Sequence, residues 1–151
     1  MKRLLESTTV NAVCISIFTA FYSLVFFTTA KNIEFEISLY YRDAYSFWPA
    51  WSSFLAAGNQ RYIAYALIAA TILIVVLLVM RRRPYDEYHT SILTNCLVVA
   101  VVLTLIAIAI FYLMIINEPG GILVKFTLFI VIHWTTVVFA NLIYVLMCRW
   151  R

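Results

Sequence analysis

Four long apolar runs divide the chain and occupy residues 10–30, 62–80, 92–116 and 122–147. Each is close to the roughly 20 apolar residues that an α-helix needs to cross a bilayer. Nearly all of the charged residues lie outside the runs. The pattern predicts an all-α fold: a single membrane domain made of an antiparallel bundle of four transmembrane helices.

The connection between the first two runs, residues 31–61, is long enough to hold structure of its own. Residues 33–39 (IEFEISL) alternate between apolar and mostly polar side chains, and this period of two is typical of a β-strand. A lone strand is unstable, so we expect it to pair with the same segment of another subunit. Ile33, Phe35 and Ile37 are then candidate contacts in a homo-oligomer.

The same outer loop carries a second predicted element. Pro49 suits the first turn of a short helix, and Gly58 is expected to end it. Trp48 and Trp51 fall on one side of this helix, and tryptophan prefers the membrane interface. We therefore expect the loop to lie across the outer headgroup layer. The two tryptophans belong either to an aromatic belt or to an oligomer contact or external sensor.

Arg81, Arg82 and Arg83 follow directly on the second run and fix the orientation of the chain. A guanidinium at the centre of a span costs about 2.5–3.5 kcal/mol on insertion scales, so the three arginines stop the helix at a membrane surface. Pro84 prevents the helix from simply continuing. Basic loops favour the cytoplasmic side, which makes residues 81–91 an inner loop.

The charge balance agrees with this topology. Seven basic and three acidic residues fall on the predicted inner side, against four of each on the outer side. We therefore predict a multi-pass protein of the cell inner membrane with both termini in the cytoplasm. The first run is too long for the 7–15-residue core of a signal peptide, and we interpret it as a retained span.

Composition narrows the class of protein further. Of 151 residues, 65% are hydrophobic and only 12% are charged, whereas soluble domains have about 25% charged residues. The net charge of +4 does not indicate direct nucleic-acid binding, because the basic residues sit at membrane flanks. There they meet anionic lipid headgroups.

A set of polar residues is predicted near the middle of the bilayer. His133 lies well inside the fourth run, with Thr136 one turn further on, and Thr19 and Thr104 come out at comparable depth. Hydroxyl and imidazole groups can simply join helices by hydrogen bonds of about 0.6–2 kcal/mol. The alternative is a functional polar site or pore lining, since ionisable groups in spans are candidate functional residues.

The sequence predicts no catalytic site, no metal and no cofactor. The two histidines, His89 and His133, have no acidic or cysteine partner at ligand spacing. Cys14, Cys96 and Cys148 fall in the cytoplasmic halves of their runs and are expected to stay reduced.

Three hypotheses follow. The first is a non-enzymatic oligomeric subunit that senses membrane state and recruits or regulates a cytosolic protein. Its docking or lipid-contact surface would be the basic inner face: Arg81, Arg82, Arg83, Arg149 and Arg151. The second is a small channel or transporter subunit lined by His133 and the threonines. The third, an intramembrane lipid enzyme, lacks a nucleophile and a base.

In size and span number, with four runs and Arg81-Arg82-Arg83, the chain resembles the small four-span membrane component of Kiwa-type bacterial antiphage systems. The resemblance is one of architecture and carries over no site residue. It implies a role in antiviral defence and a cytosolic DNA-binding effector as the partner.

Overall fold

The structure is a computed structural model, and it describes residues 8–32, 47–80, 87–117 and 120–149. These ranges fold into helices, and the elements are α2 (Thr8–Lys31), α4 (Phe47–Phe54), a π-helical turn (Leu55–Asn59), α5 (Gln60–Val79), α6 (Glu87–Asn117) and α7 (Ile122–Arg149). Four helical stretches in the described ranges are long and apolar enough to cross a membrane: Thr9–Ala30, Phe47–Val79, Thr90–Asn117 and Ile122–Met147. The prediction of an all-α, four-span membrane bundle is confirmed.

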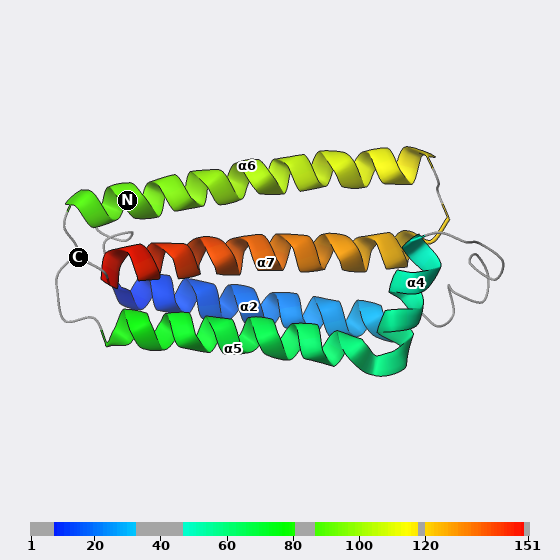
Figure 1. Cartoon of the computed structure of the whole chain (residues 1–151), viewed down its shortest axis with the longest axis horizontal. Coiled ribbons are helices and arrows are strands. Elements are labelled where there is room, and N and C mark those ends of the chain that lie inside the picture. The colour runs from blue at the N-terminus through cyan, green and yellow to red at the C-terminus, as the bar shows by residue number, and fades with distance from the viewer. Residues whose placement is uncertain (1–7, 33–46, 81–86, 118–119, 150–151) are drawn as a thin grey trace.

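The long helices run side by side, and α7 occupies the central position among them (Figure 1). It contacts α2 and α5 on one side and α6 on the other. At one end α2 begins and α7 ends, and at the other lies the short helix α4 (Figure 1). We call these the termini end and the α4 end. By its helix lengths and hydropathy, this is a multi-pass protein in contact with lipid.

Helices α2, α5 and α7 form the packed core. On α5 the buried residues recur at alternating intervals of three and four, which places them on one helical face. They are Ala64, Leu67, Thr71, Ile74 and Leu78. The buried residues Ala12, Ile15 and Thr19 begin an equivalent stripe on α2, and Phe26 continues it. Two such faces meet at a small crossing angle, as in a coiled coil.

The central helix α7 contributes the largest buried side chain. Trp134 and Val138 are fully buried, and the Trp134 ring lies 6.4 Å from that of Phe26. A cavity-forming substitution at Trp134 would remove its contact with Phe26 on α2. The core of the bundle is therefore centred on α7.

Helix α6 is attached differently from the other three. Only 6% of its most apolar stretch is buried, against 33% for α7. The described residues buried on this helix are Ile92, Leu93, Ala100 and Ala107. The last three recur at intervals of seven, and this repeat makes one narrow seam against α7. Most of the other apolar side chains described on this helix are exposed, so lipid or another protein must cover them.

The predicted short helix of the outer loop is present as α4. Pro49 lies in its first turn, and Gly58 interrupts the helical conformation before α5, both as expected. Gly58 adopts φ of +83° at a kink between the two helices, a conformation that glycine adopts without the Cβ clash of other residues. A π-helical turn thus links α4 to α5, and Trp48 and Trp51 pack against this chain's own core.

Several sequence predictions fall outside the described residues. These are the strand at residues 33–39 with Ile33, Phe35 and Ile37, the arginines Arg81, Arg82 and Arg83, and Arg151. Arg149 is the last residue of α7, and its side chain is not described. Helix α6 begins at Glu87, before the predicted start at Ile92, because helical hydrogen bonding continues beyond the apolar stretch into polar residues.

Candidate functional site

His133 is part of an aromatic cluster between α2 and α7. Its Nδ1 is hydrogen-bonded to the hydroxyl of Tyr22 on α2. The Phe18 and Phe129 rings lie 5.8 and 6.0 Å from the imidazole, and Phe18 stacks on Tyr22 at 4.3 Å. The imidazole is thereby held in one orientation by a partner that the sequence analysis did not identify.

Thr19 is paired across a different interface. Its Oγ1 lies 2.9 Å from Oγ1 of Thr71 on α5, and both residues are buried. The Thr71 hydroxyl also lies 2.9 Å from the carbonyl oxygen of Leu67 and donates to it. Thr19 must then donate to Thr71, since a hydroxyl has one proton to give. This hydrogen bond joins α2 to α5 inside the core.

The Thr19–Thr71 pair lines a groove of about 340 Å³ between α2 and α5. Ser16 and Ser23 of α2 also line it, and each donates its hydroxyl to a backbone carbonyl of its own helix, at 2.7 and 2.9 Å. The remaining lining is mostly aliphatic. We call this the hydroxyl groove, and it is the most polar membrane-depth surface among the described grooves.

Thr104 and Thr136 do not join either pair. Each donates its hydroxyl at 2.8 Å to the carbonyl oxygen four residues earlier in its own helix, Ala100 for Thr104 and Ile132 for Thr136. The structure therefore does not bring the four predicted midplane residues together: His133 bonds to Tyr22, Thr19 bonds to Thr71, and the other two threonines bond to their own helices.

A buried lysine marks the α4 end. Lys125 of α7 is only 2% exposed, and its Nζ donates to the carbonyl oxygen of Gly120 at 2.9 Å. The ammonium lies 5.6 Å from the Trp48 ring centroid, within range of a cation–π interaction worth about 0.5–2 kcal/mol. From the sequence, this lysine was expected only to be one of the outer charges.

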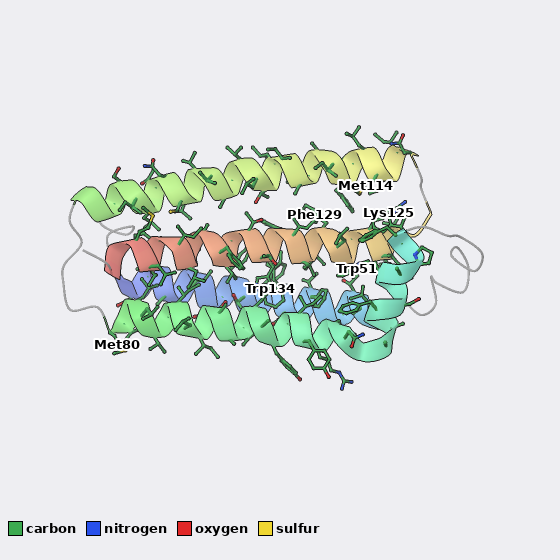
Figure 2. The ribbon with its side chains drawn as sticks, viewed as in Figure 1. Trp51, Met80, Met114, Lys125, Phe129 and Trp134 are labelled. Atoms are coloured by element: carbon green, nitrogen blue, oxygen red, sulfur yellow. The ribbon has the colours of Figure 1, made fainter. Side chains whose placement is uncertain are left out.

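The side chain of Trp51 connects α4 to the same part of α7 by a hydrogen bond. Its Nε1 lies 3.4 Å from Oγ1 of the fully buried Thr127 and donates to it. Figure 2 shows Trp51 and Lys125 at the α4 end and Trp134 near the middle of the bundle. The candidate oligomer-contact residues Trp48 and Trp51 thus have partners within their own chain.

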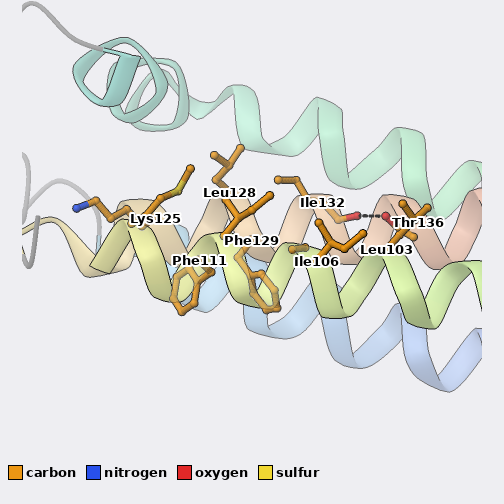
Figure 3. A pocket seen from close by; sticks show the side chains of 11 residues that line it. Leu103, Ile106, Phe111, Lys125, Leu128, Phe129, Ile132 and Thr136 are labelled. Carbon is orange, nitrogen blue, oxygen red and sulfur yellow. Dashed lines mark hydrogen bonds between the residues drawn. The ribbon is translucent and has the colours of Figure 1, made fainter. Parts of the chain in front are cut away.

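A second groove separates α6 from α7 and is almost entirely apolar (Figure 3). Its volume is about 200 Å³. The lining comes from both helices: Leu103, Ile106, Ala107, Ile110, Phe111 and Met114 of α6, and Lys125, Leu128, Phe129, Ile132 and Thr136 of α7. We call it the α6–α7 groove.

The described residues contain no group of three or more metal-ligating side chains, so the structure offers no metal centre there. The indole Nε1 of Trp134 is buried without a hydrogen-bond partner in the described part of the chain. It packs in the core and lines neither groove. What the described residues provide is a set of polar helix contacts, the hydroxyl groove, the α6–α7 groove and a buried cation at one end.

No family model, no curated protein and no solved structure matches this chain.

Proposed function

We propose that this four-span protein is a non-enzymatic, oligomeric subunit of the cell inner membrane that senses the state of the bilayer. Its output is the recruitment or regulation of a cytosolic protein. The observation that carries the proposal is the attachment of α6. This helix packs principally against α7 along one narrow seam, and most of its other described apolar side chains are exposed.

A sensor needs an element with two arrangements whose relative free energy depends on the signal. Helix α6 fits this requirement, because moving it would leave the contacts among α2, α5 and α7 intact. A long apolar helix also responds to bilayer thickness by tilting, at a cost of fractions of a kcal/mol per Å of mismatch. The bilayer would then set the position of α6 relative to α7.

The output would pass through the start of α6. This helix begins at Glu87, shortly after Arg81, Arg82 and Arg83. With both termini and this loop in the cytoplasm, a change in α6 moves a basic surface that suits an acidic patch on a soluble partner. The exposed apolar faces of α6 support assembly with further copies.

From the architectural resemblance to the membrane component of Kiwa-type systems, we infer a role in antiphage defence. On that hypothesis the cytosolic partner binds nucleic acid, and the membrane subunit itself does not. The four-helix architecture is consistent with the resemblance.

Site-specific photo-crosslinking in cells tests the proposal. A photoreactive amino acid at Arg83 should capture a soluble protein, and the yield should change when the membrane is depolarised or thinned. The same amino acid at Asn117, the far end of α6, is the control and should capture none. If the crosslinking yield at Arg83 does not change with the membrane treatment, the proposal that the protein senses the state of the bilayer is refuted.

The hydroxyl groove favours a second candidate function, a channel or transporter subunit. If symmetric copies met at this groove, Ser16, Thr19 and Ser23 would line a shared polar path near Thr71. The measurement is conductance in planar bilayers. Loss of an ion current in Ser16→Ala with Ser23→Ala, while the oligomer mass is unchanged, would move this function to first place.

A further inference from the structure

A row of aromatic rings crosses the bundle from α6 to α2. Phe111 of α6 lies 5.1 Å from Phe129 of α7, centroid to centroid, and Figure 3 shows the two side chains next to each other. The Phe129 ring lies 6.0 Å from the imidazole of His133, which in turn lies 5.1 Å from the ring of Tyr22 on α2. We call these residues the aromatic row. Through it, α7 carries a side-chain connection between the loosely attached α6 and the packed core.

The spacing of the residues explains why the row forms. Phe129 and His133 are four positions apart on α7, and side chains at this spacing are neighbours on one helical face. Phe18 and Tyr22 repeat the spacing on α2, where their rings stack at 4.3 Å. Phe111 is half-buried, unlike most of the apolar side chains described on α6. Helix α6 therefore reaches the row through one side chain.

Phe129 is held in place by rings from two helices. Phe126, three positions earlier on α7, lies 6.4 Å away, and Phe111 of α6 lies 5.1 Å away. A phenylalanine in a helix has two common χ1 rotamers, and packing against its neighbours decides between them. If α6 moves away from α7, Phe129 loses the dispersion contacts that Phe111 supplies. The present rotamer then loses its advantage, and the ring can turn.

The hydrogen bond of His133 depends on the ring beside it. Phe129 and Phe18 flank the imidazole at 6.0 and 5.8 Å. The Nδ1 atom must point at the hydroxyl of Tyr22, since a hydrogen bond weakens steeply when the donor and acceptor are misaligned. When Phe129 turns, the imidazole loses one of these two neighbours and is free to rotate away from Tyr22. The strength of the bond is therefore set in part by a residue outside it.

We propose that Phe129 couples the position of α6 to the hydrogen bond between Tyr22 and His133. With α6 beside α7, Phe111 holds Phe129 and the bond is aligned. With α6 displaced, Phe129 turns and the bond weakens, while α2, α5 and α7 stay packed. Coupling requires an element with two discrete arrangements, and the Phe129 side chain supplies it. This coupling states how a movement of α6 reaches the core, and in that respect it rests on the proposed function.

NMR of the imidazole nitrogens tests the coupling. The chain has two histidines, His89 and His133, so purified protein with isotope-labelled histidine gives few signals, and His133→Gln identifies those of His133. The chemical shift of Nδ1 depends on its hydrogen bond, and Tyr22→Phe gives the value without that bond. Phe111→Leu removes the α6 ring and should move the wild-type Nδ1 signal toward the Tyr22→Phe value. Phe129→Leu removes the intermediate ring and should produce the same shift.

Phe139→Leu is the matched control. It makes the same change on α7, the helix of His133, at a ring that is 53% exposed and outside the aromatic row. It should leave the Nδ1 signal at the wild-type position. An equal shift in this variant would show that the signal responds to the loss of any ring from α7, and it would overturn the coupling.

A double-mutant cycle measures the coupling as an equilibrium. Phe111→Leu and Tyr22→Phe should each reduce the equilibrium constant for folding in mixed detergent. If the two sites are coupled, the double variant should lose less than the product of the two single losses, by a factor of about three or more. The control cycle combines Phe111→Leu with Thr71→Val, because Thr71 of α5 is bonded to Thr19 and lies outside the row. In the control cycle the two losses should multiply.

Two further results would overturn the inference. One is an Nδ1 signal that stays at the wild-type position in either Phe111→Leu or Phe129→Leu, and the other is a double variant whose loss equals the product of the single losses. Both are measured on purified protein and are independent of the cellular crosslinking experiment. An Nδ1 shift in Phe111→Leu without a membrane-dependent crosslink at Arg83 would refute only the proposed function, and the reverse would refute only the coupling.

Discussion

The hydroxyl of Tyr22 on α2 is hydrogen-bonded to Nδ1 of His133 on α7, and the two rings meet edge to face at 5.1 Å. This contact joins two helices at membrane depth, where water is scarce and a hydrogen bond lost is not easily replaced. His133, the one histidine within the described spans, therefore connects α7 to α2. The polar interior of the protein is therefore organised first as helix contacts.

Removing this link should destabilise the bundle. Tyr22→Phe retains the ring and deletes the hydroxyl, and we expect the free energy of unfolding in mixed detergent to fall by about 0.6–2 kcal/mol. Tyr112→Phe is the control, since Tyr112 is 61% exposed on α6. An equal loss of stability in both variants would show that the hydrogen bond to His133 contributes nothing.

His133 itself should serve structure rather than ion movement. His133→Gln can still bond to Tyr22 but does not titrate near neutral pH, so we expect an intact oligomer with unchanged activity at every pH. Oligomer mass and liposome ion flux measure the two properties. If the oligomer persists while a pH-dependent flux disappears, the channel function replaces the sensor.

The Thr19–Thr71 pair predicts a contrast between buried threonines and those bonded only within their own helix. Thr71→Val removes a hydrogen bond between helices and should lower the free energy of unfolding by about 1 kcal/mol. Thr136→Val removes only a bond to its own helix, to Ile132, and should have a much smaller effect. The detergent unfolding midpoint of each variant is the measurement, and the opposite ranking would contradict the structure.

Unequal attachment of the helices predicts a second contrast. Leu67 is 6% exposed in the core, whereas Leu105 is 60% exposed on α6. Leu67→Ala should cost about 2 kcal/mol or more, as cavity-forming substitutions do, while Leu105→Ala should be nearly neutral. Similar losses at the two positions would mean that a second chain covers Leu105 in the folded protein.

The sequence was sufficient for the spans and for α4 because each rests on strong local signals. Runs of apolar residues identify helices in hydrocarbon, and Pro49 with its flanking tryptophans identifies a short interfacial helix. The sequence could not identify α6 as the loosely attached helix. Lipid is as apolar as leucine, so buried and lipid-facing surfaces of a transmembrane helix have similar compositions. The repeat of Leu93, Ala100 and Ala107 can be identified as a contact with α7 only when the position of α7 is known.

The candidate site was predictable in its residues but not in its pairings. His133, Thr19 and Trp51 were evident as polar or interfacial side chains in apolar surroundings. Their partners Tyr22, Thr71 and Thr127 were not, because each is one of many similar residues in its run. Lys125 was counted as an outer charge, and only the turn at Gly120 places its ammonium in a buried setting.

The central claim, that the bilayer sets the position of α6, is tested most directly by distance measurement between spin labels. Labels at Leu105→Cys on α6 and Leu73→Cys on α5, in a background with the three native cysteines changed to serine, report the position of α6 relative to the core. Ile17→Cys on α2 with Leu73→Cys on α5 is the control pair, because both labels lie on the surface of helices that form the core. Mixing the labelled protein with excess unlabelled protein removes the distances between labels on different chains. In nanodiscs of phosphatidylcholine with short and with long acyl chains, which differ in thickness, we predict that the Leu105–Leu73 distance distribution differs between the two bilayers while that of the control pair does not. Identical Leu105–Leu73 distributions in the two bilayers would contradict the claim.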